Sequence, residues 1–253
     1  EESYFDKIAD PSGGSYYIEN LTHSIAEYAW KLFQDIEAKG GYVEAFKAGF
    51  IQDQVTESAN KRNMNIATRR EILLGTNQYP NALEKVEANI KETCCTSTKR
   101  DDAIAEPIKI FRGAEQMETL RLKTERAKET PKVFLLTIGD LTMRKARAGF
   151  ASGFFACAGF EVVDNLGFNS VEEGVKAAMD QKADIVVVCS SDDEYTDAAP
   201  AVLEQIGDKA ITVVAGYPKA VDELKAKGIE HFIHMKSNLI ETLQGFQAEL
   251  GIK

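Results

Sequence analysis

The sequence predicts an α/β fold whose second half is a five-stranded parallel sheet covered by helices on both faces. From Lys132 onward, short apolar runs alternate with amphipathic stretches of helical spacing. The runs are rich in Val and Ile and are separated by enough residues for a helix to return the chain to the same edge of the sheet. Such a domain is flavodoxin-like or Rossmann-like, and it binds ligands beyond the carboxyl ends of its strands.

Each element of this half follows from one apolar run or one amphipathic stretch. The expected strands cover 133–138, 161–164, 185–189, 211–215 and 231–233. The expected helices cover 141–158, 171–181, 197–206, 220–227 and 239–250. The loops at the strand ends are rich in small and polar residues, as in a ligand-binding rim, although turns of any α/β domain have a similar composition.

The first half of the chain is predicted to be mainly helical. Thr22 is a plausible N-cap for a helix that runs to Lys39 and is stopped by two glycines. A second helix is expected over 42–62, and the stretch 72–79 is expected to be a short strand or an extended segment, ended by Pro80.

Residues 81–131 are expected to form a connector with a charged helix over 113–128, and Pro131 marks the boundary to the sheet. The predicted domains are therefore 1–80, 81–131 and 132–253. Because the chain opens on Glu1-Glu2 rather than Met, we expect it to be a piece of a longer polypeptide.

Composition excludes several classes of protein. The net charge of −10 argues against a nucleic-acid partner, which would require clustered Lys and Arg. No apolar run approaches the roughly 20 residues that span a bilayer, and no signal segment opens the chain, so we expect no membrane partner and a cytoplasmic location. The cysteines have neither disulfide nor zinc spacing and are expected to be reduced, structural thiols: Cys94, Cys95, Cys157 and Cys189.

One segment carries a specific resemblance. The wording Asp10-Pro-Ser-Gly-Gly-Ser-Tyr-Tyr-Ile-Glu19 resembles the end of the catalytic barrel of the methylmalonyl-CoA mutase family, and 132–253 lies where that family carries its cobalamin-binding domain. The resemblance implies that 1–80 is the end of a TIM-barrel domain and that the family cofactor is adenosylcobalamin. It also implies the small subunit of a heterodimeric mutase, whose partner is the large catalytic subunit.

Family members that bind cobalamin place a cobalt-ligating histidine in the loop after the first strand, within an Asp-x-His-x-x-Gly stretch. Here that position falls on Met143 or Arg144, and arginine has no lone pair to give. The resemblance therefore implies a degenerate cofactor site, whose residues, if it is used, are Asp140, Thr142, Ser190, Ser191 and Gly216. No catalytic residue, no metal ligand and no cofactor bound by this chain are expected.

Simpler interpretations exist for the other residues of this region. Asp140 is explained as a carboxylate at a helix N-terminus. The cationic side chains of Arg144, Lys145 and Arg147 are explained as a solvated helix face, although they could also face a partner. Each of the three histidines (His23, His231 and His234) is explained as a structural or surface residue rather than a metal ligand.

These observations favour a structural, non-catalytic small subunit that is inactive alone and serves the isomerisation of methylmalonyl-CoA and succinyl-CoA in propionate metabolism. One alternative is a cobalamin-binding component of an active mutase whose lower cobalt position is empty or is filled by a group other than histidine. A second alternative is a stand-alone α/β binding module. The Asp10–Glu19 wording counts against this second alternative, since such a module has no need of a barrel end.

Overall fold

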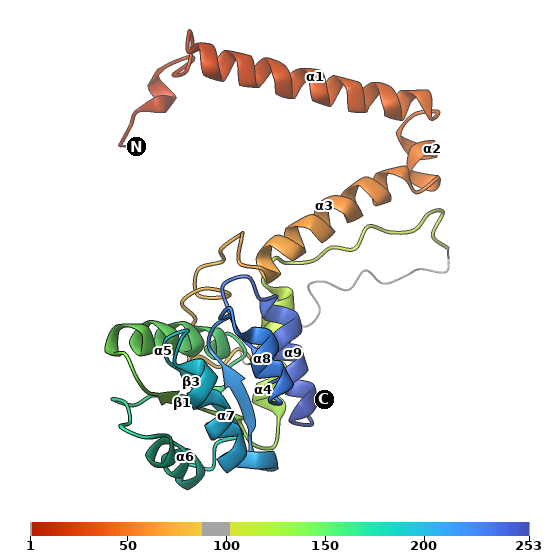
Figure 1. The fold of residues 1–253 in the computed structure, drawn as a ribbon. Helices are drawn as coiled ribbons and strands as arrows, with labels where there is room; N and C mark the ends of the chain where they lie inside the picture. Colours follow the sequence, from red (N-terminus) through yellow and green to blue (C-terminus); the bar gives the residue numbers. More distant parts are fainter. Residues whose placement is uncertain (1, 88–101, 253) are drawn as a thin grey trace. The chain divides into compact units, whose positions relative to one another are not determined.

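The computed structural model describes residues 2–87 and 102–252, which divide into two compact units. The described residues of the first unit are 2–58 and 102–109, and those of the second are 59–87 and 110–252 (Figure 1). Among the described residues, no helix combines the length and the apolar composition needed to cross a bilayer.

The first unit is helical. It contains η1 (Phe5–Lys7), α1 (Tyr16–Ala38), α2 (Tyr42–Lys47) and the first part of α3 (Phe50–Ala67). The predicted start of the first helix is wrong, because the N-cap of α1 is Ser15 and not Thr22. No helix-breaking residue follows Gly14, and the Glu19 carboxylate accepts a hydrogen bond from the Gly14 amide at 3.4 Å, so the helix begins directly after the glycine turn.

Two further predictions for the first half are wrong. The helix expected over 42–62 is two helices, because Gly49 adopts a left-handed φ of 84° between α2 and α3, and α3 continues to Ala67. The short strand or extended segment expected over 72–79 is a turn closed by an isolated bridge between Leu74 and Gln78. The buried Asn77 side chain holds this turn, since its amide oxygen accepts from the Leu73 amide at 2.8 Å and its Nδ2 donates to the Ile66 carbonyl at 2.8 Å.

The second unit contains the predicted parallel sheet, which has five strands in the order β2-β1-β3-β4-β5. The strands are β1 (Lys132–Thr137), β2 (Glu161–Val163), β3 (Ile185–Cys189), β4 (Ile211–Val214) and β5 (His231–Phe232). Every strand pair is parallel, and β3 is buried along its whole length. This confirms the predicted α/β class and gives the strand order of flavodoxin-like domains.

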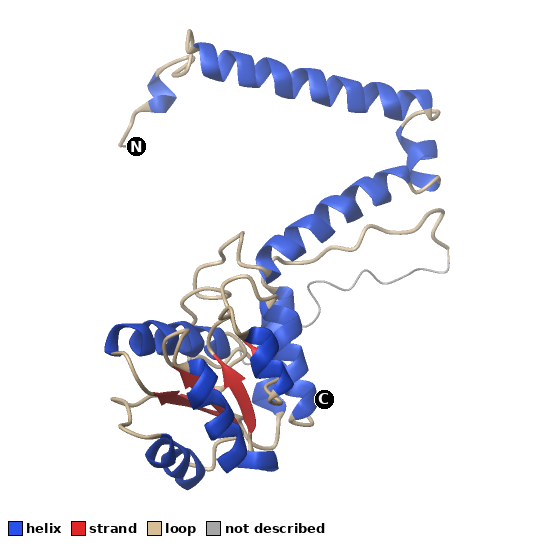
Figure 2. Cartoon of the chain, viewed as in Figure 1, coloured by secondary structure: helices blue, strands red, loops and turns tan. Residues whose placement is uncertain are grey.

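Helices cover both faces of the sheet, as the blue and red elements of Figure 2 show. They are α4 (Glu115–Arg126), α5 (Leu141–Ala156), α6 (Val171–Asp180), α7 (Tyr195–Ile206), α8 (Val221–Ala226) and α9 (Leu239–Glu249). Helices α4, α5 and α9 pack on one face of the sheet in one apolar core, and helices α6, α7 and α8 pack on the opposite face in a second core. The observed ends differ from the predicted ones by up to two residues, within the usual spread for helix and strand ends.

Helix α4 connects the preceding chain to this domain. Its buried Arg121 donates to the Asn81 carbonyl at 2.7 Å and to the Glu84 carbonyl at 3.1 Å. On another side of α4, Gln247 of α9 donates to the Leu120 carbonyl at 2.8 Å. Residues 81–84 are thus hydrogen-bonded to α4, which is itself hydrogen-bonded to α9.

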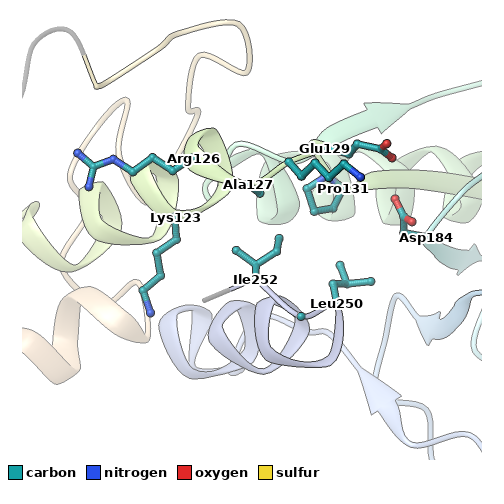
Figure 3. Close-up of a pocket in the computed structure, with 10 residues that line it drawn as sticks. Lys123, Arg126, Ala127, Glu129, Pro131, Asp184, Leu250 and Ile252 are labelled. Carbon is teal, nitrogen blue, oxygen red and sulfur yellow. The ribbon is translucent and has the colours of Figure 1, made fainter.

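At the amino edge of the sheet, a hollow of about 590 Å³ lies beside the chain that enters β1 (Figure 3). Ala127 and Pro131 line it from that side, and Leu250 and Ile252 line it from the residues after α9. The two ends of the sheet-bearing segment therefore lie at the same corner of the domain.

Candidate functional site

The strand order places the switch point of the sheet between β1 and β3, since the chain leaves β1 toward β2 and then returns to the other side. The loops after these two strands diverge there, and ligands of such sheets bind between them. Of the predicted site residues, Asp140 lies in the first of these loops, and Ser190 and Ser191 lie in the second. Thr142 is exposed in the first turn of α5 and is outside the hydrogen-bonded group described next.

The centre of the switch point holds a carboxylate, that of Glu194. Its Oε2 lies 2.5 Å from the Ser190 hydroxyl and accepts from the Ser191 hydroxyl at 2.7 Å. The same oxygen accepts from the backbone amide of Ser191 at 3.1 Å and from that of Asp140 at 3.3 Å. One oxygen atom thus ties the loop after β1 to the loop after β3.

This environment favours the ionised form of the Glu194 side chain. Hydrogen bonds from Ser190 and then Ser191 lower the pKa of Glu194 from 4.5 to about 2, against an opposing effect of burial. The Ser190 hydroxyl has one proton and also lies 2.9 Å from the Ile138 carbonyl, so it can donate to only one of these two acceptors at a time. The carboxylate is therefore charged throughout the physiological pH range.

Gly139 allows this close approach. A Cβ atom built at residue 139 would overlap the Glu194 carboxylate, and the backbone there adopts a φ of 78°. Both observations require glycine, because a side chain would clash and L-residues rarely adopt this conformation. The loop after β1 is thus shaped around Glu194.

A second side chain fills the space on the β4 side. Tyr195 is fully buried, and its hydroxyl donates to the Ala215 carbonyl at 2.7 Å and accepts from the Ser190 amide at 3.2 Å. A Cβ at Gly216, a predicted site residue, would lie 3.1 Å from the Tyr195 ring. Burial raises the pKa of Tyr195, so the hydroxyl stays protonated and can keep donating to Ala215.

Two of the three cations at the start of α5 fold back onto the loops. Arg144 donates to the Gly139 carbonyl at 3.2 Å and to the Leu166 carbonyl at 3.3 Å. Arg147 pairs with Asp192 at 2.8 Å. Of the three cationic residues expected on a solvated helix face, only Lys145 is exposed, and Arg144 and Arg147 are half-buried.

The loop after β1 offers no nitrogen donor for a cobalt ion. Asp140 is the N-cap of α5 and accepts from the Met143 amide at 2.8 Å, as its simpler interpretation expects. Met143 is a thioether, and the Arg144 guanidinium is engaged by two carbonyls. The side chains of this loop do not fit a corrinoid held through a protein nitrogen.

The histidines lie elsewhere and have other contacts. His231, at the start of β5, lies 3.2 Å from the Glu249 carboxylate, and its ring packs on Phe246 at 5.2 Å. His234, after β5, packs on Tyr217 at 4.8 Å, and burial lowers its pKa. Within residues 2–87 and 102–252, no cluster of three or more His, Cys, Asp or Glu side chains is arranged to hold a metal ion.

The exposed His23 of α1 pairs with Glu27 at 3.2 Å. The two described cysteines, Cys157 and Cys189, are buried and free, whereas Cys94 and Cys95 lie outside the described residues.

Sequence reasoning missed the central residue of this site. Glu194 is not among the residues predicted for this site. The structure distinguishes it from the two acids before it, since Asp192 pairs with Arg147 and Asp193 is exposed. A signal was present, because Ser191-Asp-Asp-Glu194 has the Ser-x-x-Glu spacing of a capping box, in which the carboxylate returns to the serine amide.

Comparison with known proteins identifies relatives over the whole chain. A family model described as methylmalonyl-CoA mutase matches residues 1–148. A protein of Porphyromonas gingivalis named "Methylmalonyl-CoA mutase small subunit" is 52% identical over 257 residues, which cover 100% of this chain and 41% of that protein. A Mycobacterium tuberculosis protein named "Probable methylmalonyl-CoA mutase small subunit" is 31% identical, covering 99% of this chain and 39% of its own length.

A Streptomyces virginiae protein named "Methylmalonyl-CoA mutase small subunit" is 32% identical over 209 residues, which cover 80% of this chain and 32% of that protein. The chain thus spans about two fifths or less of the length of these curated relatives. The family model covers more than half of the chain, from its first residue into α5. The chain therefore belongs to the methylmalonyl-CoA mutase family.

Proposed function

We propose that this chain is part of the small subunit of a two-subunit methylmalonyl-CoA mutase, in which it is a structural, non-catalytic partner of the large subunit. Its similarity to proteins named small subunits, which extends over the whole chain, supports this role. In the family reaction, methylmalonyl-CoA and succinyl-CoA interconvert, and adenosylcobalamin supplies the radical chemistry when it is bound. We assign that chemistry, and the place in propionate metabolism and the cytoplasm that goes with it, to the complex.

The observation that carries the proposal is the loop after β1. Cobalt ligation from below needs a neutral imidazole whose second nitrogen is held by a carboxylate. Here Asp140 is committed to the Met143 amide, and Arg144 is committed to the carbonyls of Gly139 and Leu166. Neither position can supply the nitrogen, so we infer that cobalamin is not ligated by this chain.

The packed sheet supports a structural role. An apolar core lies on each face of the sheet, and the Glu194 carboxylate at the switch point is hydrogen-bonded within the protein itself. A domain of this kind is folded and rigid without a ligand, as a scaffold within a larger enzyme needs to be.

The test is an absorbance titration of the purified chain with hydroxocobalamin and with adenosylcobalamin. A histidine-bearing mutase domain is the positive control, and a desalting column then separates bound from free corrin. We expect no spectral shift and no retained corrin. Tight binding would favour the alternative, a cobalamin-binding component without histidine ligation.

A second experiment tests the partner. Co-expression of the full-length small subunit with its large subunit should give a stable complex that carries mutase activity, and the small subunit alone should be inactive. If no complex forms, the stand-alone α/β module becomes the better interpretation.

A further inference from the structure

We infer that Glu194 closes the switch-point crevice from inside and that this closure, in addition to the missing imidazole, keeps a corrinoid out of the domain. The inference rests on the proposed function and deepens it. It assigns the loss of cofactor binding to two independent features, of which the closure is visible only in the structure.

The first argument is geometric. A ligand at a parallel-sheet switch point enters between the loops after β1 and β3. The Glu194 carboxylate occupies that position, because it accepts from the Asp140 amide on one loop and from the Ser191 amide and hydroxyl on the other. The close fit to Gly139 shows that the loop after β1 is folded down onto the carboxylate.

The second argument is energetic. A ligand entering here would strip an ionised carboxylate of its hydroxyl and amide donors, and burying an unpaired charge is costly. The space next to Glu194 on the β4 side is also filled, since the Tyr195 side chain is fully buried there and hydrogen-bonded to the Ala215 carbonyl. The ion pair of Arg147 with Asp192 joins α5 to the same β3 loop.

The two features predict different outcomes for different variants. If only the imidazole is missing, then Met143→His or Arg144→His alone restores binding. If the crevice is also closed, then histidine alone fails, and binding requires removal of the Glu194 side chain as well. Asp193→Ala is the matched control, because it removes the adjacent exposed acid, whose side chain lies outside the hydrogen-bonded group.

The experiment titrates hydroxocobalamin and dicyanocobinamide, which lacks the nucleotide tail, into the parent chain and its variants. The variants are Met143→His, Arg144→His, Glu194→Ala and each histidine combined with Glu194→Ala or with Asp193→Ala. Hydrogen exchange of the Asp140 and Ser191 amides is measured on the same proteins, and Glu194→Gln serves as the variant that preserves side-chain size.

We expect at least one histidine to give binding about tenfold tighter or better with Glu194→Ala than alone or with Asp193→Ala. We also expect Glu194→Ala to lower amide protection at Asp140 and Ser191, with Glu194→Gln intermediate and Asp193→Ala unchanged. Equal binding by a histidine variant with and without Glu194 would overturn the closure, as would unchanged protection or failure of both combined variants to bind. Binding by the parent chain would instead refute the proposed function, so the two failures are distinguishable.

Discussion

Replacing Glu194 by glutamine should remove a pH-dependent part of the stability of the sheet domain. Hydrogen bonds from Ser190 and Ser191 lower the pKa of the folded-state carboxyl from 4.5 to about 2. A group whose pKa is depressed by folding stabilises the protein fully above its unfolded pKa and loses that contribution as pH falls through the folded value. The contribution of Glu194 is therefore complete above about pH 5 and disappears toward pH 2.

The size of the effect follows from the same pKa difference. The full difference would correspond to at most roughly 3 kcal/mol. Because Glu194 is only half-buried and solvent screens its interactions, we expect ~1–2 kcal/mol at neutral pH. Glutamine keeps the size of the side chain but cannot ionise, so the parent chain should exceed Glu194→Gln by this amount at pH 7, and the gap should close on acidification.

The assay is urea unfolding at several pH values between 7 and 3, followed by circular dichroism. Tryptophan fluorescence is unsuitable, because the single tryptophan, Trp30, lies in α1 of the other unit. Asp193→Asn is the control and should differ little from the parent chain. A gap between parent and Glu194→Gln that stays constant or widens as pH falls would refute the reasoning.

Three further predictions concern the rest of the second unit. Gly174→Ala should destabilise the second unit by about 1–3 kcal/mol, because the new Cβ would lie 2.8 Å from Cγ of a buried leucine. The control Gly245→Ala in α9 meets nothing within 4 Å and should be neutral or stabilising by up to ~1 kcal/mol. The urea unfolding midpoints of the two variants are compared with that of the parent chain. Arg121→Met should lower the free energy of unfolding by about 2 kcal/mol, because the carbonyls of Asn81 and Glu84 lose their donor, and it should increase proteolysis before residue 88. The control Lys123→Met, on the exposed side of α4, should change neither quantity. Burial raises the pKa of Cys157 to about 12, so iodoacetamide at pH 8 should alkylate this thiol only after denaturant is added. Alkylation of Cys157 itself in the folded chain at the rate of a free thiol would contradict this prediction.

The sheet domain could be predicted because its signals are local. The strands lie in short apolar runs, and each crossover has helical spacing, so the class and the number of strands follow from the sequence. Asp140 could be explained in the same way, since an N-cap depends only on the next few residues.

The errors fell where the structure depends on contacts distant in sequence or on single glycines. Sequence did not fix the strand order, so the meeting of the Asp140 and Ser191 loops around Glu194 could not be derived. The region 72–79 was apolar enough to suggest a strand, but Asn77 satisfies the backbone of Leu73 and makes a turn there. Gly49 divided a helix whose apolar pattern continued across it.

The hollow at the amino edge of the sheet has a consequence for protein engineering. Since Pro131 and Ile252 both line it, the sheet-bearing segment enters and leaves at one corner. Adjacent ends make a domain suitable for grafting into a host loop or for circular permutation, because neither operation has to span the body of the protein. The segment can therefore be moved as a cassette, provided that the apolar face of α9 which α4 covers receives a substitute helix.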